Sequence, residues 1–252
     1  MNDLTTIDTE LAILDSMDTS PAGLENLEPG DIGMPPRLRI SQQNRPIEVG
    51  GEQREPGTIV NMLTGEVWND LEIVPIVFLP RTRLYWPETF NADNNPICLS
   101  DDGKMPSLNR GATDPQPGPC KDCPCAKFVN GEKPQCSLQR NFLVWLVAEN
   151  EPAILTLSST GLRAAKKLTA LSKMQGLRKS IIFSTAKVSG SKGTWFEPTF
   201  ARGTQLAADD VLALVVARDE LKLLTVEADE GETFEGEQQP AGAVQEVDEI
   251  PF

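Results

Sequence analysis

Both ends of this chain are acidic and carry no basic side chain, which confines a folded core to the middle. Residues 1–36 hold eight Asp and Glu residues, and residues 227–252 hold nine. Neither segment contains Lys or Arg, and the first is also rich in Pro and Gly. Such segments bury too little apolar surface to offset the entropy that ordering costs. We predict a disordered N-terminal arm over 1–36, a folded domain over 37–226 and a disordered acidic tail over 227–252.

The chain contains no histidine, which excludes several kinds of catalytic site. Ser-His-Asp and Cys-His nucleophile systems, imidazole bases and zinc sites with an imidazole ligand are all ruled out. The longest apolar runs, 142–148 and 211–217, have seven residues, far below the roughly 20 that a membrane-spanning helix needs. The N-terminal residues lack the basic and then apolar order of a secretory signal. We therefore expect a cytoplasmic protein that is not an enzyme.

The middle of the chain is patterned mostly as strands separated by turn residues. Helices are expected from Ser159 or Thr160 to about Met174, and from Asp209 or Asp210 to about 218–223. Mostly antiparallel strands with a helix inserted late fit an OB-like antiparallel barrel better than a parallel sheet, so the predicted fold class is mainly β (α+β). β-Branched and aromatic content bounded by Gly, Pro and Asn-Gly signals predicts strands at 37–40, 57–62, 72–79, 81–86, 141–147, 153–158, 181–188 and 193–200.

All five cysteines lie within an insertion of the barrel, over about 87–138, that has little regular patterning. Cys120 and Cys123 form a Cys-x2-Cys pair, which places two thiolates on one turn within reach of a tetrahedral Zn²⁺. We expect Cys98 and Cys136 to complete a structural zinc site, with Cys125 as the alternate ligand because it follows a proline. A redox-active or disulfide-forming pair and unrelated buried thiols are the other interpretations. A catalytic metal is disfavoured, because four thiolates close the coordination sphere.

Positive charge is concentrated in the middle of a chain whose formal net charge is −14. Residues 156–202 hold nine Lys and Arg residues against one acid, Glu197. Aromatic side chains lie beside Lys or Arg at 81–86 and 192–196, a pattern that suits the binding of stacked nucleobases and their adjoining phosphates. A solvated basic face and aromatics that fill the barrel core remain the alternatives. The candidate nucleic-acid-binding residues are Arg81, Arg83, Tyr85, Trp86, Arg163, Lys166, Lys167, Lys173, Arg178, Lys179, Lys187, Lys192, Trp195 and Phe196.

The acidic tail ends in an apolar tip, Asp248-Glu249-Ile250-Pro251-Phe252. Phe252 can fill an apolar pocket while Asp248 and Glu249 steer the tip toward a basic rim. An ordinary solubilising tail is the other interpretation. The tip resembles the acidic C-terminal tip of bacterial single-stranded DNA-binding proteins, which implies docking of replication, recombination and repair enzymes. The plan of OB-like body, zinc insertion and acidic tail is similar to phage-type single-stranded DNA-binding proteins of the T-even kind, although their zinc ligands include a histidine. This resemblance implies a phage or prophage origin, and so the cytoplasm of a bacterial host.

These features together predict a sequence-independent single-stranded DNA-binding protein of phage replication or recombination, which protects the strand and recruits enzymes through its tip. The alternative is an adaptor or decoy that occupies host replication enzymes through the tail without binding DNA. A zinc deaminase is a third interpretation, because Pro119, Cys120 and Cys123 match half of that signature, but the His-x-Glu half is missing. The oligomeric state is not fixed by any of these features.

Overall fold

The computed structural model describes residues 35–86, 95–108, 111–129, 133–190 and 193–230. Its contacts divide the chain into two compact units, Gly33–Leu221 and a second formed by Met1–Ile32 with Lys222–Phe252. All the elements below lie in the larger unit, except the end of the last helix. None of the helices in the described ranges has the length and apolar content to cross a membrane.

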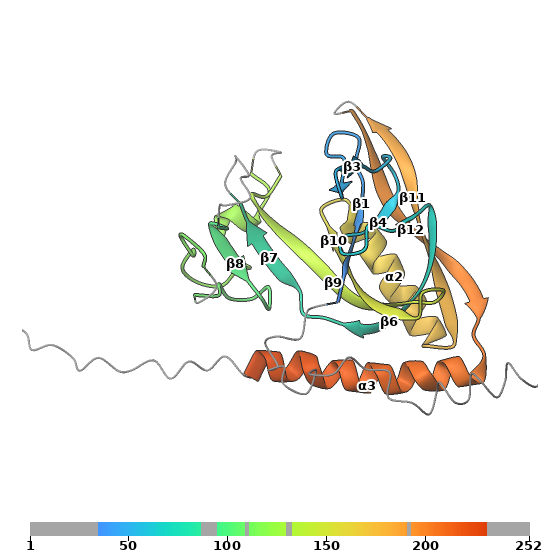
Figure 1. Ribbon diagram of the computed structural model, residues 1–252. Coiled ribbons are helices and arrows are strands. Elements are labelled where there is room, and N and C mark those ends of the chain that lie inside the picture. Colours follow the sequence, from blue (N-terminus) through green and yellow to red (C-terminus); the bar gives the residue numbers. More distant parts are fainter. Residues whose placement is uncertain (1–34, 87–94, 109–110, 130–132, 191–192, 231–252) are drawn as a thin grey trace, which may run out of the picture. The chain divides into compact units, whose positions relative to one another are not determined.

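The larger unit is built on one curled, mainly antiparallel sheet that forms a half-barrel (Figure 1). Its main path runs in the order β12-β11-β6-β9-β10-β1-β4-β5, and β7 pairs with both β8 and β9. Only β1 and β10 pair in parallel among the pairings of the described strands. The strands are β1 Arg37–Ile40, β2 Glu48–Val49, β3 Glu52–Gln53, β4 Ile59–Asn61, β5 Val67–Trp68, β6 Asp70–Phe78, β7 Thr82–Tyr85, β8 Cys98–Ser100, β9 Cys136–Leu146, β10 Glu151–Ser158, β11 Lys179–Gly190 and β12 Gly193–Gln205.

The prediction of a mainly β fold with two helices is confirmed, and each predicted strand overlaps an observed one, whereas β2, β3, β5 and β8 were not predicted. The sheet itself is open, because β12 and β5 lie at opposite ends of its strand order. The cysteine insertion is more ordered than its composition suggests, since it contributes β8 and the short 3₁₀ helix η2 (Pro124–Ala126). The inserted segment thus extends the sheet beside β7 and the start of β9.

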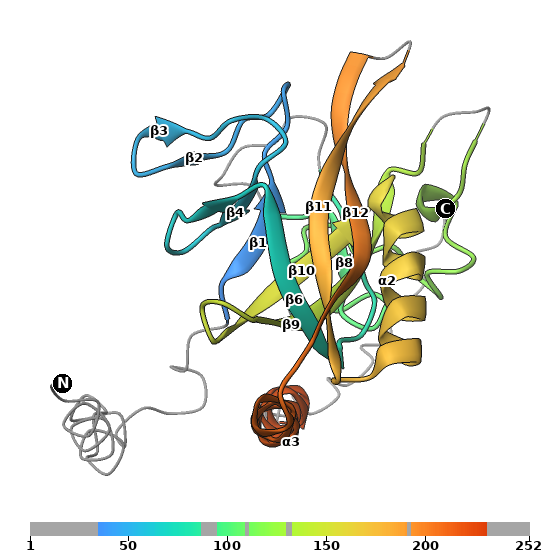
Figure 2. The same cartoon turned by 90° about the vertical axis from the view of Figure 1, so that its right-hand side faces the viewer.

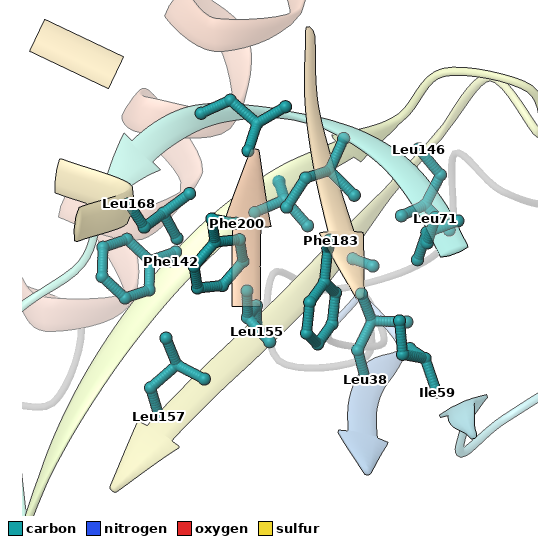
Figure 3. Close-up of a cluster of buried hydrophobic side chains, with 14 of the residues drawn as sticks. Leu38, Ile59, Leu71, Phe142, Leu146, Leu155, Leu157, Leu168, Phe183 and Phe200 are labelled. Atoms are coloured by element: carbon teal, nitrogen blue, oxygen red, sulfur yellow. The ribbon is translucent and has the colours of Figure 1, made fainter. Parts of the chain in front are cut away.

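Two clusters of buried apolar side chains lie on opposite faces of the sheet. In β9, Phe142, Val144 and Leu146 enter the first cluster, whereas Leu143 enters the second. Successive side chains of a strand point to opposite faces, so the continuous apolar run of β9 is explained by burial on both sides. Figure 3 shows the first cluster, in which the rings of Phe183 and Phe200 stack with centroids 5.2 Å apart.

Helix α2 (Gly161–Gln175) covers part of the first cluster and contacts β10 and β12 (Figure 2). Leu168 is completely buried against the sheet. The helix ends where Gly176 takes a φ of +59° and donates its N–H to the Ser172 carbonyl at 2.9 Å. Its start at Thr160 agrees with prediction, although no side-chain hydrogen bond caps it.

Helix α3 (Ala208–Glu230) extends beyond its predicted end. Leu214 and Leu221 join the second cluster, on the face of the sheet opposite α2. The helix continues through residues 227–230, which composition assigns to the acidic tail. Glu and Ala are good helix formers, so acidity alone does not mark the point where a helix stops.

A carboxylate on β6 joins the two strands beyond it. Glu72 Oε1 accepts hydrogen bonds from the Ser180 hydroxyl, and from the Thr204 amide at 3.1 Å and hydroxyl at 2.6 Å. The bond from Ser180, followed by those from Thr204, lowers the pKa of Glu72 below its ordinary value. The charged form is therefore the one that these donors stabilise.

We expect Glu72→Gln to lower the free energy of unfolding near neutral pH. The contribution of a carboxyl whose folded pKa is lowered is complete above its unfolded pKa and is lost as the pH falls through the folded pKa. The difference between wild type and variant should therefore shrink as the pH drops below about 4.5, measured by urea unfolding at several pH values. Glu48→Gln removes the same charge from an exposed site on β2 and is the control. A wild-type advantage that persists unchanged at acidic pH would contradict this account.

Candidate functional site

A groove of about 970 Å³ lies where β1, β7, β10 and β12 approach one another. Its lining includes the end of β10, Thr160 and the first residue of α2, Gly161. The sheet positions these segments directly, because β1 pairs with β10 and α2 follows β10 in the chain. The lining residues are Arg37, Leu38, Arg39, Ile40, Gln42, Arg45, Leu84, Trp86, Gln139, Leu155, Thr156, Leu157, Ser158, Thr160, Gly161, Phe196 and Pro198.

Three arginines make the groove cationic. Arg37 and Arg39 are exposed on β1, on either side of Leu38, which is only 2% exposed. The alternation of the strand therefore turns the apolar side chain into the core and leaves both guanidinium groups outside. Arg45 follows in the next loop and is also exposed. In the described part of the chain, none of the three has a carboxylate partner within 4.0 Å. They are available to an anionic ligand.

Two aromatic side chains line the groove from different strands. Trp86 follows the last residue of β7, and Phe196 lies on β12. Both are half-buried. The groove therefore combines aromatic rings with arginine side chains, and this is the combination that stacks bases and holds the adjoining phosphates.

The position of Phe196 is fixed by a side-chain clamp. The Gln42 amide donates to the Phe196 carbonyl at 2.9 Å and accepts from the Phe196 N–H at 2.9 Å. The side chain thus pairs with β12 as a neighbouring strand would. Gly57, with a φ of +94°, lies under the ring, because a Cβ there would be 2.5 Å from Phe196 Cε1. A residue other than glycine at this position would displace the ring.

Of the aromatic candidates, Trp86 and Phe196 reach the groove, whereas Trp195 does not line it. Trp195 approaches Gly190 across the β11–β12 hairpin and donates its indole N–H to Glu197 at 2.8 Å. Tyr85 alternates with Leu84 and Trp86 and so lies on the other face of β7.

The basic candidates are spread over several surfaces. Arg83 turns toward the cysteines, and Arg81 is exposed beside Arg140. Burial, followed by the charge of Arg81, lowers the pKa of Arg140. Lys192 lies outside the described residues. The other candidates are exposed along α2, the turn after it and β11, without lining the groove: Arg163, Lys166, Lys167, Lys173, Arg178, Lys179 and Lys187.

The groove arginines were missed by the sequence analysis. Arg37, Arg39 and Arg45 precede the strongly basic segment at 156–202, and a charge count over long windows gives them little weight. A short sequence pattern could have identified two of them, because Arg-Leu-Arg-Ile in a strand places two arginine side chains on the same face.

Four of the five cysteines share one small cavity. Cys98, Cys120 and Cys136 are buried, Cys123 is half-buried, and all four line a cavity of about 10 Å³ with Arg83. The sheet places two of them, because Cys98 on β8 and Cys136 on β9 both pair with Tyr85 of β7. The tight turn that carries the Cys-x2-Cys pair places the other two, and the Cys120 N–H donates to the Lys104 carbonyl at 2.7 Å.

Cys125 lies outside this cavity. It lines a separate hollow of about 260 Å³ with Lys127, Val129 and Lys133, although it remains close to Cys123. Burial, and then the neighbouring Cys123, raises the pKa of the Cys125 thiol. Burial also raises the pKa of the Cys136 thiol, which a hydrogen bond from Arg83 and the charge of Arg83 partly offset. Across the described ranges, no three Cys, Asp or Glu side chains are arranged to hold a metal ion as they stand.

The tail tip, Asp248–Phe252, and residues 1–34 of the arm predicted over 1–36 lie outside the described residues. Comparison with family models, curated proteins and solved structures finds no match for this chain.

We expect Gln42→Ala to release the Phe196 backbone without unfolding the domain. The variant loses two hydrogen bonds, which should lower the free energy of unfolding by about 1–3 kcal/mol. The specific measurement is amide hydrogen exchange, in which the Phe196 N–H should exchange faster. Gln43→Ala alters the exposed neighbouring glutamine and is the matched control. Equal protection of the Phe196 amide in the two variants would show that Gln42 does not hold β12.

Proposed function

We propose that this chain is a non-enzymatic protein that binds single-stranded DNA without sequence preference. The observation that carries the proposal is the groove in which Arg37, Arg39 and Arg45 lie with Trp86 and Phe196. Phosphates and the flat faces of bases are common to every sequence. A site made of guanidinium groups and aromatic rings therefore binds a strand without reading it.

We further propose that the half-barrel is an OB-like body. If β6, β9, β10, β11 and β12 are numbered 1 to 5 along the chain, their order across the sheet, β12-β11-β6-β9-β10, is 5-4-1-2-3. Helix α2 follows the third of them, β10. This order and the position of the helix support the OB assignment. OB folds bind oligonucleotides across their second and third strands and the loops after the first and fourth strands. In this chain those features are β9, β10, the cysteine insertion and the β11–β12 hairpin.

The strength of binding would come from two different terms. Each stacked base contributes about 1–3 kcal/mol, and each neutralised phosphate releases counterions and makes the affinity depend on salt. The exposed basic side chains of α2 and β11, including Lys166, Lys167 and Lys187, would contact phosphates of the strand beyond the groove. Arg81 and the other exposed candidates would add to the same long-range attraction.

Zn²⁺ is the cofactor that we propose for the cysteine cavity. The residues present fit it, because Cys98, Cys120, Cys123 and Cys136 supply the four sulfur ligands of a closed structural site and line one cavity. When bound, the ion would tie β8 and the Cys-x2-Cys turn to the start of β9. Its contribution would be to folding rather than to chemistry.

The acidic tip is the proposed docking element for replication, recombination and repair enzymes. Ile250, Pro251 and Phe252 supply apolar contacts, and Asp248 and Glu249 supply charge that complements a basic rim. A phage origin and action in the bacterial cytoplasm are part of the same proposal. The alternative in which the chain is an adaptor or decoy rests on this tip alone.

Fluorescence titration with oligo-dT at several salt concentrations tests the groove. We expect quenching of tryptophan fluorescence and an affinity that falls as salt rises. Arg37→Ala combined with Arg39→Ala removes two phosphate contacts, so the slope of log K against log salt should become shallower by about 1.4. Arg202→Ala combined with Arg218→Ala removes equal charge outside the groove and is the control. No binding by wild type, or equal slopes for the two double variants, would contradict the proposed site.

Deletion of residues 244–252 separates DNA binding from partner docking. Because the acidic tail competes with DNA for basic side chains, the truncated protein should bind oligo-dT as well as the full chain or better at low salt. Its binding to a purified replication or repair enzyme that recognises such tips should be lost. A full-length chain that binds the enzyme but shows no affinity for DNA would favour the adaptor alternative.

A further inference from the structure

Among the described residues that line the cysteine cavity, Arg83 is the only one with a basic side chain. It lies in the middle of β7, opposite Ser100 on β8 and Leu138 on β9. Its side chain lines the same cavity as Cys136 and lies close enough to influence that thiol. The pairing of these three strands therefore places a guanidinium group, which is a cation with several N–H donors, in the cavity that the four cysteines line.

In the described ranges of the chain, this cation has no carboxylate partner. Within the described residues, neither Asp nor Glu forms an ion pair with Arg83, and its Nε atom is buried without a hydrogen-bond acceptor. The nearby Asp102 is engaged elsewhere, with Ser100 and the backbone N–H groups of Lys104 and Met105. Burial of a charge is costly unless a partner of opposite charge compensates it.

Neutral thiols do not provide that compensation, whereas thiolates bound to a metal do. Four thiolates around Zn²⁺ leave the centre with an excess of negative charge, spread over sulfur atoms that accept hydrogen bonds. We propose that Arg83 balances the charge of a four-thiolate zinc centre formed by Cys98, Cys120, Cys123 and Cys136, and that Cys125 is not a ligand. Arg83 would act on the sulfur ligands and not on the ion itself, so it is a positioning residue.

The same argument excludes Cys125. It lines the hollow that contains Lys127 and Lys133 and does not line the cavity of the other four cysteines. Arg83 does not line that hollow. Lys127 and Lys133 are exposed to water, whereas the Nε atom of Arg83 is buried, so the cavity that Arg83 lines is the one we assign to the thiolates.

Competition between the full-length protein and a zinc chelator tests the proposal. Hydrogen-bond partners of metal ligands typically change metal affinity by 10–100-fold, so Arg83→Met should weaken zinc binding by that factor. Arg83→Lys, which keeps the charge and a donor, should recover most of the affinity. Arg81→Met removes a charge two residues away, outside the cavity, and should match wild type. Equal zinc affinity in the Arg83→Met and Arg81→Met variants would overturn the role of Arg83.

Cobalt substitution reports the ligand set independently, because sulfur-to-cobalt charge-transfer absorption grows with the number of bound thiolates. Cys125→Ser should leave this absorption unchanged, and Cys123→Ser should lower it. The reverse result would overturn the assignment of ligands. If Arg83→Met does not fold, the Lys variant decides, since loss of zinc affinity despite a retained cation would refute charge balance. All these measurements are made without DNA, so their failure is distinct from a failure of the proposed DNA binding.

Discussion

The structure depends on the pairing of β9 with a different set of partners at each end. Its C-terminal half lies between β6 and β10 and is buried on both faces, with Phe142 and Val144 in one cluster and Leu143 in the other. Its N-terminal half pairs instead with β7 and carries Cys136 into the cysteine cavity. One continuous strand is therefore part of both the buried core and the inserted segment, and it holds the insertion in place against the sheet. Without that pairing, neither β7 nor the cavity would have a fixed position relative to the sheet.

The groove follows from the sheet being open. Edges of a sheet expose backbone groups unless something covers them, and here Gln42 covers part of β12 by pairing with Phe196. The Thr185 hydroxyl donates to the Gly57 carbonyl and fastens β11 to the same loop. The loop after β1 therefore ties the long hairpin to the strand that carries Arg37 and Arg39. Cationic and aromatic side chains meet because this contact brings together residues that lie more than 150 positions apart in the sequence.

Local pattern was sufficient to predict most elements but not the groove. The turn at Gly176 and the apolar run of β9 are encoded by neighbouring residues, so α2 and the central strands could be placed from the sequence. The clustering of four cysteines could also be foreseen, because two are close in sequence and the other two lie nearer the ends of the same insertion. The proximity of Arg37 and Phe196 in the groove could not be predicted from the sequence, since it results from strand pairing and from the hydrogen bonds of Gln42 with Phe196. The alternation of side chains in a strand predicts that Arg83 and Trp86 lie on opposite faces of β7. Only the structure shows that the face with Arg83 borders the cysteine cavity.

The two faces of β7 connect the cysteine cavity with the groove. Leu84 and Trp86 line the groove, and Arg83, which precedes Leu84 on the other face, lines the cavity, as alternation in a strand requires. β7 has only four residues, and it pairs with β8 on one side and β9 on the other. The position of Trp86, directly after β7, therefore depends in part on these two pairings. An ion that fixes Cys98 and Cys136, the residues paired on either side of Tyr85, would also fix the wall on which Trp86 stands. In this arrangement the proposed metal site and the proposed DNA-binding groove lie on opposite faces of one strand, β7.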